Sequence, residues 1–564
     1  MKVVIVGGVA GGASAAARIR RLDEKAEITI FERSGYISYA NCGLPYYIGG
    51  VIENQKELTL QTPENFYKRF RVDVRIRHEV IQLHPEKHEV SVRNLETGEV
   101  FIEQYDKLLL SPGAIPAQPK LSGMDIERLF TLRTVEDTLR IRRFIDENQP
   151  KSVVLAGGGF ISLELAENLR DLGMEVTIIQ RPLQLMNPFD ADMAVLIHAK
   201  LREKGIKLML GHSVEGFEEH QEKVEVLLKD EAAVSADMVV LAIGVVPESQ
   251  LAKDAGLKLG IKGSILVNER METSAADIYA VGDAVQVKHS VTGEDVLLSL
   301  AGPANKQGRI AAENICGGNR RYFGSQGSSI IKIFDMSAAV TGINEKEAKR
   351  LGLDYDKVYL TPMNHAGYYP GGRSMLMKVL FERQTASILG AQIIGYDGVD
   401  KRIDVLATAI HAKMSAYDLQ ELDLAYAPSY SSAKDPVNMA GFMIENILSG
   451  RLKQFFYEDL AELNKEEDVI RLDVRTSNEY LKGHLEGFVN IPVDELRNRI
   501  SELVKGKKVY VMCQSGIRSY IACRLLMQHG FDCYNFAGGY SFYQIQEKEG
   551  LFMKESYPCG REKV

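Results

Sequence analysis

The chain has 564 residues, too many for one domain, and at roughly 150 residues each about four domains are expected. Hydrophobic residues make up 45% of it and charged residues 26%, the balance of an ordinary globular protein. The net charge of −8 and the lack of a basic run argue against nucleic acid or an acidic membrane surface as a partner.

The cysteines are few for this length and irregularly spaced: Cys42, Cys316, Cys513, Cys523, Cys533 and Cys559. This pattern favours a reducing compartment, and hence the cytoplasm, over a disulfide scaffold. Cys523 and Cys533 are expected to be buried small hydrophobic side chains. No apolar run is long enough to span a membrane, and we predict no metal site.

The first residues predict a nucleotide-binding βαβ unit. Residues 2–6 (KVVIV) indicate a buried strand, so no signal peptide is expected before it. The run GGVAGG follows at residues 7–12, then a helix rich in alanine and arginine to about Leu22, and a second strand at residues 28–31. Glycines permit the tight strand-to-helix turn and let a pyrophosphate approach the helix N-terminus.

Glu32 supplies the next part of this fingerprint. It follows Gly12 by 20 residues, the spacing of an acid that binds the ribose of a dinucleotide. Val9 stands where the fingerprint has its middle glycine, which is a departure. Strand, helix, strand and acid in this order predict a dinucleotide site.

Cys42 lies shortly after this unit, within residues 38–46 (SYANCGLPY), and no second cysteine lies within four residues of it. Disulfide reductases with a close cysteine pair form their redox disulfide internally, which a lone cysteine cannot do. Cys42 must therefore form a mixed disulfide with a substrate thiol, or an oxidised sulfur acid.

Two later segments indicate which nucleotide binds first. Residues 105–114 (YDKLLLSPGA) and 273–283 (TSAADIYAVGD) each end a strand in a glycine turn, and both resemble motifs of two-dinucleotide flavoproteins. In those proteins the Gly-Asp aspartate holds the ribityl chain, and a neighbouring helix N-terminus faces the flavin. The resemblance therefore implies FAD, with contacts at Gly7, Gly12, Glu32, Arg33, Ser111, Gly113, Gly282, Asp283 and Ala301.

A second βαβ unit begins at residues 152–155, continues through AGGGFIS at 156–162, and has its partner strand at 176–179. An acid after that strand would bind the ribose diol of NAD, but Gln180 and Arg181 stand there. NADH is expected from the resemblance, and NADPH stays open because an arginine can accept a 2′-phosphate. The expected contacts to NAD(P)H are Gly157, Gly159, Phe160, Gln180 and Gly244. Phe160 is expected either to pack over the flavin or to belong to the core.

The segment from about residue 323 to 446 alternates expected strands, such as 329–334 and 374–381, with expected helices, such as 345–351 and 403–413. In two-dinucleotide flavoproteins this region pairs with its twin, so a homodimer is expected. It carries the loops NHAGYYPG and AYAPSYSSAKDP, whose tyrosines are expected to be exposed enough to donate hydrogen bonds.

Residues 1–446 resemble coenzyme A-disulfide reductase, a single-cysteine branch of the flavin disulfide reductases. The family motif SFxxC reads SYANC here and ends at Cys42, and the family's APPY reads APSY. The resemblance implies two catalytic tyrosines from the partner subunit, Tyr368 and Tyr426, with His365 as a structural neighbour. It also implies contacts to coenzyme A from Arg18, Arg21, Ser38 and Asn41. The two arginines would bind its phosphates, or else they form a solvated helix face.

The C-terminal region resembles a rhodanese domain over residues 455–550. Residues 450–457 are expected to be a linker, and strands are expected at 469–475 and 508–512. The latter strand delivers Cys513 to the loop CQSGIRS.

The Cys513 loop is expected to cradle an anion. Inward backbone N–H groups, a helix N-terminus and Arg518 would stabilise a thiolate or the terminal sulfur of a persulfide. The spacing is C-x4-R, shorter than the C-x5-R of related phosphatases, so the loop favours sulfur over phosphate. We therefore predict a reactive Cys513 that carries sulfane sulfur, rather than a docking module.

The sequence predicts an α/β protein with two Rossmann-like dinucleotide-binding domains, an α+β dimerisation domain and a C-terminal α/β rhodanese domain. The FAD-binding domain is expected at 1–115 and 245–322, and the NAD(P)H-binding domain at 116–244. The dimerisation domain is expected at 323–446 and the rhodanese domain at 455–564.

The hypothesis is an NADH-dependent flavoprotein that reduces persulfides and polysulfides, with coenzyme A persulfide as the expected substrate and coenzyme A-disulfide reductase activity beside it. Cys42 would form a mixed disulfide with coenzyme A, and Cys513 would hand sulfur to the carrier thiol. One alternative is an NADH peroxidase or oxidase that cycles through a Cys42 sulfenic acid. Another is a redox-sensing or sulfur-relay module that acts on a protein partner.

Overall fold

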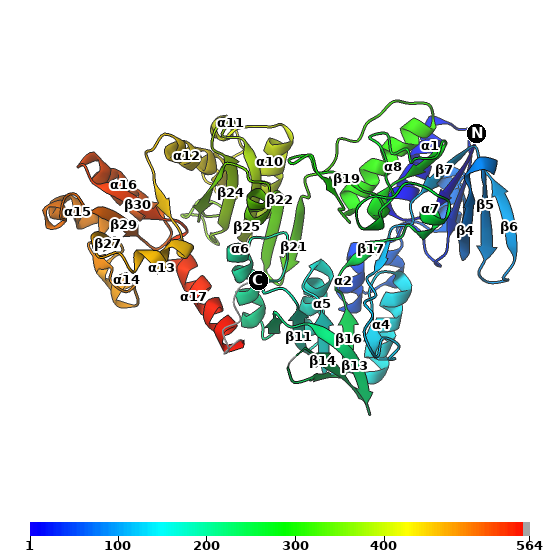
Figure 1. The fold of residues 1–564 in the computed structure, drawn as a ribbon, viewed down its shortest axis with the longest axis horizontal. Coiled ribbons are helices and arrows are strands. Elements are labelled where there is room, and N and C mark those ends of the chain that lie inside the picture. Colours follow the sequence, from blue (N-terminus) through cyan, green and yellow to red (C-terminus); the bar gives the residue numbers. More distant parts are fainter. Residues whose placement is uncertain (230, 557–564) are drawn as a thin grey trace. The chain divides into compact units, whose positions relative to one another are not determined.

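The computed structural model describes residues 1–229 and 231–556, so Cys559 lies outside the described residues. The chain divides into two compact units (Figure 1). The first holds Met1–Leu183 and Gly205–Gly327, and the second holds Gln184–Lys204 and the chain from Ser328 onward. Among the described helices, none combines the length and apolar character needed to cross a membrane.

The first sheet of unit one is parallel and consists of β1 (Lys2–Val6), β2 (Glu27–Glu32), β3 (Asp73–Ile76), β7 (Lys107–Leu110) and β18 (Ile278–Ala280). Its order is β18-β7-β1-β2-β3, with Ile5 opposite both Ile30 and Leu109. Such a sheet is covered on both faces, which is why β1 and β7 are almost continuously apolar. The predicted first βαβ unit is confirmed.

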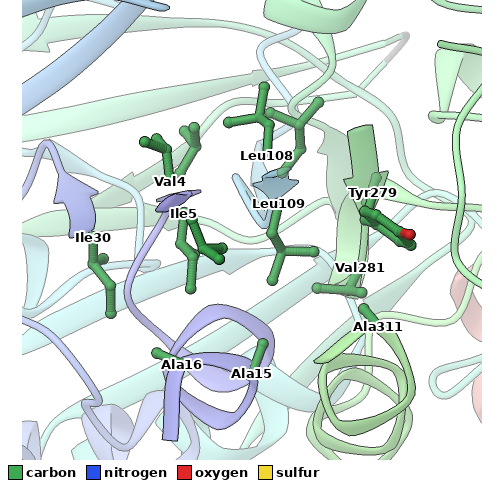
Figure 2. Close-up of a cluster of buried hydrophobic side chains, with 14 of the residues drawn as sticks. Val4, Ile5, Ala15, Ala16, Ile30, Leu108, Leu109, Tyr279, Val281 and Ala311 are labelled. Atoms are coloured by element: carbon green, nitrogen blue, oxygen red, sulfur yellow. The ribbon is translucent and has the colours of Figure 1, made fainter. Parts of the chain in front are cut away.

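Helices α1 (Ala10–Leu22) and α8 (Ala301–Ile315) pack side by side on one face of this sheet (Figure 1). Figure 2 shows Ile5 and Leu109 pointing toward the helices, where the small side chains of Ala15 and Ala311 allow close packing. Because β1 leads directly into α1, this packing fixes the glycine-rich turn between them.

The second sheet of unit one is also parallel: β9 (Leu129–Phe130), β10 (Ser152–Ala156), β11 (Glu175–Gln180), β12 (Lys207–Leu210) and β16 (Met238–Leu241). Its order is β12-β11-β10-β16-β9, with α5 (Phe160–Asp171) joining β10 to β11 and α4 (Val135–Asn148) following β9. The second predicted βαβ unit is confirmed.

Two three-stranded antiparallel sheets accompany these parallel ones. The first contains β4 (His78–His84), β5 (Glu89–Asn94) and β6 (Val100–Gln104). The second contains β13 (Val214–His220), β14 (Lys223–Leu228) and β15 (Val234–Ala236).

Unit two contains an antiparallel sheet of β21 (Ser329–Ile333), β22 (Met336–Gly342), β23 (Tyr355–Leu360), β24 (Leu376–Glu382) and β25 (Ile388–Gly395). Its order is β21-β22-β25-β24-β23. The helices of this region are α9 (Glu345–Arg350), α10 (Val399–His411), α11 (Ala416–Glu421) and α12 (Pro436–Leu448). Helix α10 packs on β22 and β25, giving the expected α+β domain.

Helix α6 (Ala191–Glu203) lies between β11 and β12 in sequence, within the segment 116–244 that was expected as one domain. The structure nevertheless groups residues 184–204 with unit two. There α6 packs against β21, β25 and the C-terminal helix α17 (Gly539–Ser556). The buried side chains of α6 therefore pack in the core of unit two, whereas β11 and β12, the strands before and after it in sequence, belong to unit one.

The C-terminal sheet is parallel: β26 (Gln454–Phe455), β27 (Val469–Asp473), β28 (Val489–Asn490), β29 (Lys508–Met512) and β30 (Asp532–Phe536). Its order is β26-β30-β29-β27-β28, and its main helices are α14 (Ser477–Leu481), α15 (Val493–Arg499) and α16 (Ile517–Gln528). Cys523 and Cys533 are fully buried in its core, as predicted.

The expectation of a linker at residues 450–457 is wrong in part, because β26 lies within it and pairs with β30. The backbone N–H of Asn535 donates to the carbonyl of Lys453, and that of Ala537 donates to Phe455. A two-residue strand carries too little alternation for a sequence pattern to reveal it, so only the tertiary pairing defines it.

Candidate functional site

The turn after β1 has room only for glycine at its two ends. Gly7 has φ of +94°, and a Cβ there would lie 2.2 Å from the carbonyl oxygen of Ser111. A Cβ on Gly12 would lie 2.0 Å from the carbonyl oxygen of Gly7. The Glu32 carboxylate, buried at the end of β2, accepts the Gly8 N–H at 2.9 Å. This tight backbone turn against a helix N-terminus fits the pyrophosphate of FAD.

The Gly-Asp segment η5 (Gly282–Ala284) lies at the same sheet edge. The Gly282 N–H donates to Gln307 of α8 at 2.7 Å, and Arg133 donates to the Asp283 carboxylate at 3.2 Å. Burial raises the pKa of Asp283, and the positive charge of Arg133 opposes that shift. Arg133 also donates to the carbonyl of Ala114, so it links the two predicted flavin segments.

Arg133 was not identified from the sequence. The one local feature that could have drawn attention to Arg133 is its position directly before Thr134, the N-cap residue of α4, which forms a capping box with Asp137. The remaining residues predicted for this site lie in unit one as well. Gly113 has φ of +79°, Ala301 is the first residue of α8, and Arg33 forms an ion pair with Glu248.

The second glycine-rich turn has a closed side and an open side. Gly157 has φ of +120°, and a Cβ there would lie 2.2 Å from the carbonyl oxygen of Ala242. Gly159 caps α5, and positions for a Cβ on Gly159 and on Gly244 have nothing within 4 Å. Open backbone at a helix N-terminus lets a dinucleotide approach closely, so these residues fit NAD(P)H. Gln180 ends β11, as predicted.

Cys42 lies in a short 3₁₀ helix, η1 (Asn41–Gly43), that leads into α2 (Leu44–Ile48). The residue is exposed, but partial desolvation of its sulfur raises the pKa of the Cys42 thiol. The negative charge of Glu164 raises it further, and Arg133 opposes the shift. In the chain itself the surroundings of Cys42 therefore disfavour the thiolate.

Glu164 lies on α5, which packs against α2. Burial, followed by the charge of Glu167, raises the pKa of Glu164 to about 7. Burial and the charge of Glu164 also raise the pKa of Tyr46 to about 12. Glu164 is thus a carboxyl group close enough to affect Cys42, and the sequence did not reveal it because α2 and α5 are far apart in the chain.

A cavity of about 330 Å³ opens beside α1 and α8. Three of the predicted coenzyme A contacts line it, Arg18, Arg21 and Ser38, as does Arg309, which sequence reasoning missed. Arg18 forms an ion pair with Glu313. Within the described residues no salt bridge joins Arg21 or Arg309 to a carboxylate, although the charge of Arg309 contributes to lowering the pKa of Glu313.

Asn41 differs from the other predicted contacts because it does not line that cavity. Its Oδ1 is buried and has no hydrogen-bond partner among the described residues. A buried amide oxygen without a donor is costly, which points to a donor on a bound molecule. Ser38, three residues earlier, lines the cavity and has φ of +46°.

The predicted tyrosines Tyr368 and Tyr426 meet in unit two. Their hydroxyl oxygens are 2.9 Å apart, and the side chains are 76% and 48% exposed. The hydrogen bond to Tyr426 raises the pKa of Tyr368. The structure thus brings together two phenols that are 58 residues apart in the chain and presents them at the surface.

Arg402, a buried residue of α10, holds the two tyrosine loops together. Its guanidinium donates to the carbonyl of Asn364 at 3.0 Å, to the Ser431 hydroxyl at 3.0 Å and to the Asp435 carboxylate at 3.1 Å. Sequence reasoning missed Arg402. Its one signal is an arginine on the apolar face of a helical pattern, where a charge requires partners.

Cys513 follows β29 and is fully buried at the base of its loop. The Gly516 N–H points at its sulfur at 3.1 Å, and the Ser519 hydroxyl donates to the sulfur at 3.2 Å. Gly516 has φ of +98° and caps α16. The predicted geometry of inward donors at a helix N-terminus is therefore present, and neutral groups supply both donors.

Arg518 forms an ion pair with Glu479 on α14 and donates to both carboxylate oxygens at 2.7 Å. The bond to Arg518 lowers the pKa of Glu479 to about 2. Arg475 is buried on Asp473 in the same way, with a closest contact of 2.7 Å. The sequence analysis did not identify Glu479, Arg475 or Asp473. The capping-box pattern of Thr476 and Glu479 was the one local sign that the Glu479 side chain has a fixed position.

Three family models match the chain. Residues 1–308 match the pyridine nucleotide-disulphide oxidoreductase model, residues 328–436 match its dimerisation domain, and residues 456–546 match a rhodanese-like domain. Coenzyme A disulfide reductase of Staphylococcus aureus (strain JH9) is 39% identical over 442 residues, which cover 78% of this chain and 99% of the relative.

Two solved structures resemble the whole chain. Reduced Bacillus anthracis CoADR-RHD is 46% identical, with a TM-score of 0.94, and the match covers 97% of this chain and 98% of that one. An NAD-dependent persulfide reductase from A. fulgidus is 37% identical, with a TM-score of 0.90, and the match covers 96% of this chain and 100% of that one.

Proposed function

The chain belongs to the pyridine nucleotide-disulphide oxidoreductase family, and from that premise we propose that it reduces coenzyme A persulfide to coenzyme A and hydrogen sulfide. Family membership makes it an oxidoreductase that uses FAD and NAD(P)H. The observation that carries the substrate proposal is the cationic cavity, because Ser38 lines it and lies four residues before the lone Cys42.

Coenzyme A would bind with its phosphates in this cavity. Arg21 and Arg309 would contact them, since both line the cavity, neither forms a salt bridge within the described residues, and arginine suits phosphate geometry. The pantetheine arm would pass Ser38 and reach Cys42. Asn41, whose Oδ1 lacks a donor, would accept a hydrogen bond from the arm.

Cys42 would act as the nucleophile. Its thiolate attacks the coenzyme A sulfur of the persulfide, a new S–S bond forms, and the bond to the terminal sulfur breaks, releasing hydrosulfide. NADH and FAD, when bound, supply the electron pair that returns Cys42 and coenzyme A to thiols. A coenzyme A disulfide would follow the same course, with coenzyme A thiolate as the leaving group.

Tyr368 and Tyr426 would protonate the leaving sulfur. The dimerisation-domain match supports a homodimer. In that dimer these phenols would act at Cys42 of the other subunit, as the family resemblance implies. Their mutual hydrogen bond keeps the Tyr368 proton on the phenol, because it raises the pKa of that group. Cys513 would accept sulfane sulfur from persulfides or polysulfides and pass it to coenzyme A.

The nicotinamide preference is proposed as NADH, with NADPH as the alternative because Gln180 and Arg181 stand at the ribose position. We also propose that the enzyme works in the cytoplasm on small-molecule thiols, persulfides and polysulfides. The lack of disulfides among the described cysteines supports a reducing compartment.

Anaerobic NADH oxidation tests the proposed function, with coenzyme A persulfide, coenzyme A disulfide and hydrogen peroxide as separate substrates. We expect turnover with the first two and one sulfide per NADH with the persulfide. Turnover with peroxide alone would instead favour the peroxidase alternative, in which Cys42 forms a sulfenic acid. A Cys513→Ser variant should keep its activity on coenzyme A disulfide and lose activity on polysulfide.

A further inference from the structure

The charges around Cys513 cancel one another. Arg518 is bound by both oxygens of Glu479, and Arg475 is bound by Asp473, so two guanidinium groups face two carboxylates. The Glu479 carboxylate is held further by the N–H and hydroxyl of Thr476 at 2.9 and 2.8 Å, which leaves it little freedom to release Arg518. Both guanidinium groups, those of Arg518 and Arg475, are therefore already paired with a carboxylate and do not offer an unpaired positive charge to a substrate.

The donors and the exposed side chains at the loop are uncharged as well. The sulfur of Cys513 receives the Gly516 N–H and the Ser519 hydroxyl. Ile517 follows Gly516 directly and is 51% exposed, and Ile521, one helical turn later, is 48% exposed. The loop therefore offers neutral hydrogen bonds to one sulfur atom and an apolar surface beside it.

We propose that the Cys513 loop takes sulfane sulfur from organic persulfides and selects against thiosulfate. The inference rests on the proposed sulfur-carrying role of Cys513. With an organic persulfide, the Cys513 thiolate attacks the terminal sulfur, the new S–S bond forms, and the donor leaves as a thiolate. With thiosulfate, the same attack expels sulfite.

The two donors differ in the charge that they bring. Thiosulfate is a dianion that carries its sulfonate charge next to the sulfur it donates, and it leaves as sulfite. The persulfide group of an organic persulfide brings at most one negative charge to the reacting sulfur, because any other charges of the donor lie farther along the molecule. A second negative charge close to a thiolate is repelled unless a cation offsets it. Arg518 is the cation placed for this purpose, and Glu479 already neutralises it. The apolar Ile517 and Ile521 suit the organic part of a persulfide.

The test measures persulfide formation at Cys513 in the full-length holoenzyme, by alkylation and peptide mass spectrometry. Glutathione persulfide and thiosulfate are compared at equal concentration, and Cys513→Ser is the control for labelling at other sites. We expect glutathione persulfide to load Cys513 at least about tenfold faster than thiosulfate.

Two variants should weaken the selection by supplying a free cation. Glu479→Gln keeps an oxygen for Thr476 but releases the charge of Arg518, and Ile517→Lys adds a cation at an exposed position while leaving the ion pair intact. Both should raise the loading rate with thiosulfate several-fold relative to glutathione persulfide. Glu479→Gln frees a cation that the native loop already contains, whereas Ile517→Lys adds one that it lacks.

The outcomes separate this inference from the proposed function. If thiosulfate loads native Cys513 as fast as the persulfide, the selection is refuted. If both folded variants leave the ratio of rates unchanged, the charge-based cause of the selection is refuted. In both cases the sulfur-carrying role stands. If neither donor loads Cys513, the sulfur-carrying role itself fails, and the inference fails with it.

Discussion

The two cysteines proposed to react, Cys42 and Cys513, have opposite surroundings. Cys42 is exposed, and partial desolvation together with the charge of Glu164 raises its pKa. Cys513 is buried, and two hydrogen-bond donors of its own loop point at its sulfur. The Cys513 loop is thus complete within one short stretch of chain.

The difference indicates how each site works. A sulfur carrier needs a stable resting place for a charged sulfur, which the Cys513 loop provides by itself. No hydrogen bond is among the causes that shift the pKa of Cys42. In the proposed mechanism its reactivity therefore depends on the molecule that binds there and on the phenols of Tyr368 and Tyr426. Substitutions at Cys42 and its helpers should therefore have larger effects on turnover than those around Cys513.

The largest effect is expected for Cys42→Ser. Serine cannot form the mixed disulfide, so NADH-driven reduction of coenzyme A persulfide and coenzyme A disulfide should fall by at least about 1,000-fold. Cys316→Ser, which changes a cysteine outside the site, is the matched control and should keep its activity. Steady-state NADH oxidation measures both. Retained turnover in Cys42→Ser would refute the proposed nucleophile.

The next largest effect is expected for the paired phenols. Tyr368→Phe and Tyr426→Phe should each lower kcat by about 100-fold, because proton transfer by a positioned group contributes that much. The double variant should lose little more, since the two hydroxyls act as one unit. Tyr417→Phe, at an exposed tyrosine of α11, is the control. Full kcat in both single variants would remove the tyrosines from the mechanism.

A smaller effect is expected at the cationic cavity. Arg309→Gln should raise KM for coenzyme A persulfide about tenfold and leave kcat unchanged, because one charge-assisted hydrogen bond to phosphate is lost. Lys306→Gln changes an exposed cation on the same helix outside the cavity and should leave KM unchanged. If both variants behave alike, the cavity does not bind coenzyme A.

The smallest effect is expected for Glu164→Gln. The negative charge of Glu164 raises the pKa of Cys42, so its removal should increase the thiolate fraction and speed alkylation of Cys42 by iodoacetamide a few-fold at pH 8. Below the Glu164 pKa of about 7 the native carboxyl is protonated, so the native and variant rates should converge. Equal rates at pH 8 would show that Glu164 does not control Cys42.

Much of the architecture could be predicted from local patterns. The turns at Gly7 and Gly157, the strands before them and the Cys513 loop each lie within one contiguous stretch, where spacing carries the information. That Cys42 has no second cysteine close to it can likewise be read directly from the sequence. The prediction of a linker at residues 450–457 was wrong in part, because the strand β26 in that segment is defined by its pairing with β30.

The residues that were missed act through tertiary contacts. Arg133 reaches Asp283 across 150 residues, and Arg518 reaches Glu479 across 39. No pattern within a helix or a loop specifies such a partner. Sequence reasoning therefore named the candidate reacting groups, with Arg518 beside Cys513, but not the side chains that contact them, such as Glu479.

The most direct test of the account is to identify the covalent intermediate at Cys42. The NADH-reduced holoenzyme is mixed anaerobically with coenzyme A persulfide, quenched in acid and digested for peptide mass spectrometry. The account predicts a disulfide between coenzyme A and the Cys42 peptide, together with released sulfide. A sulfenic acid at Cys42, or coenzyme A bound to Cys513 with Cys42 unmodified, would contradict it.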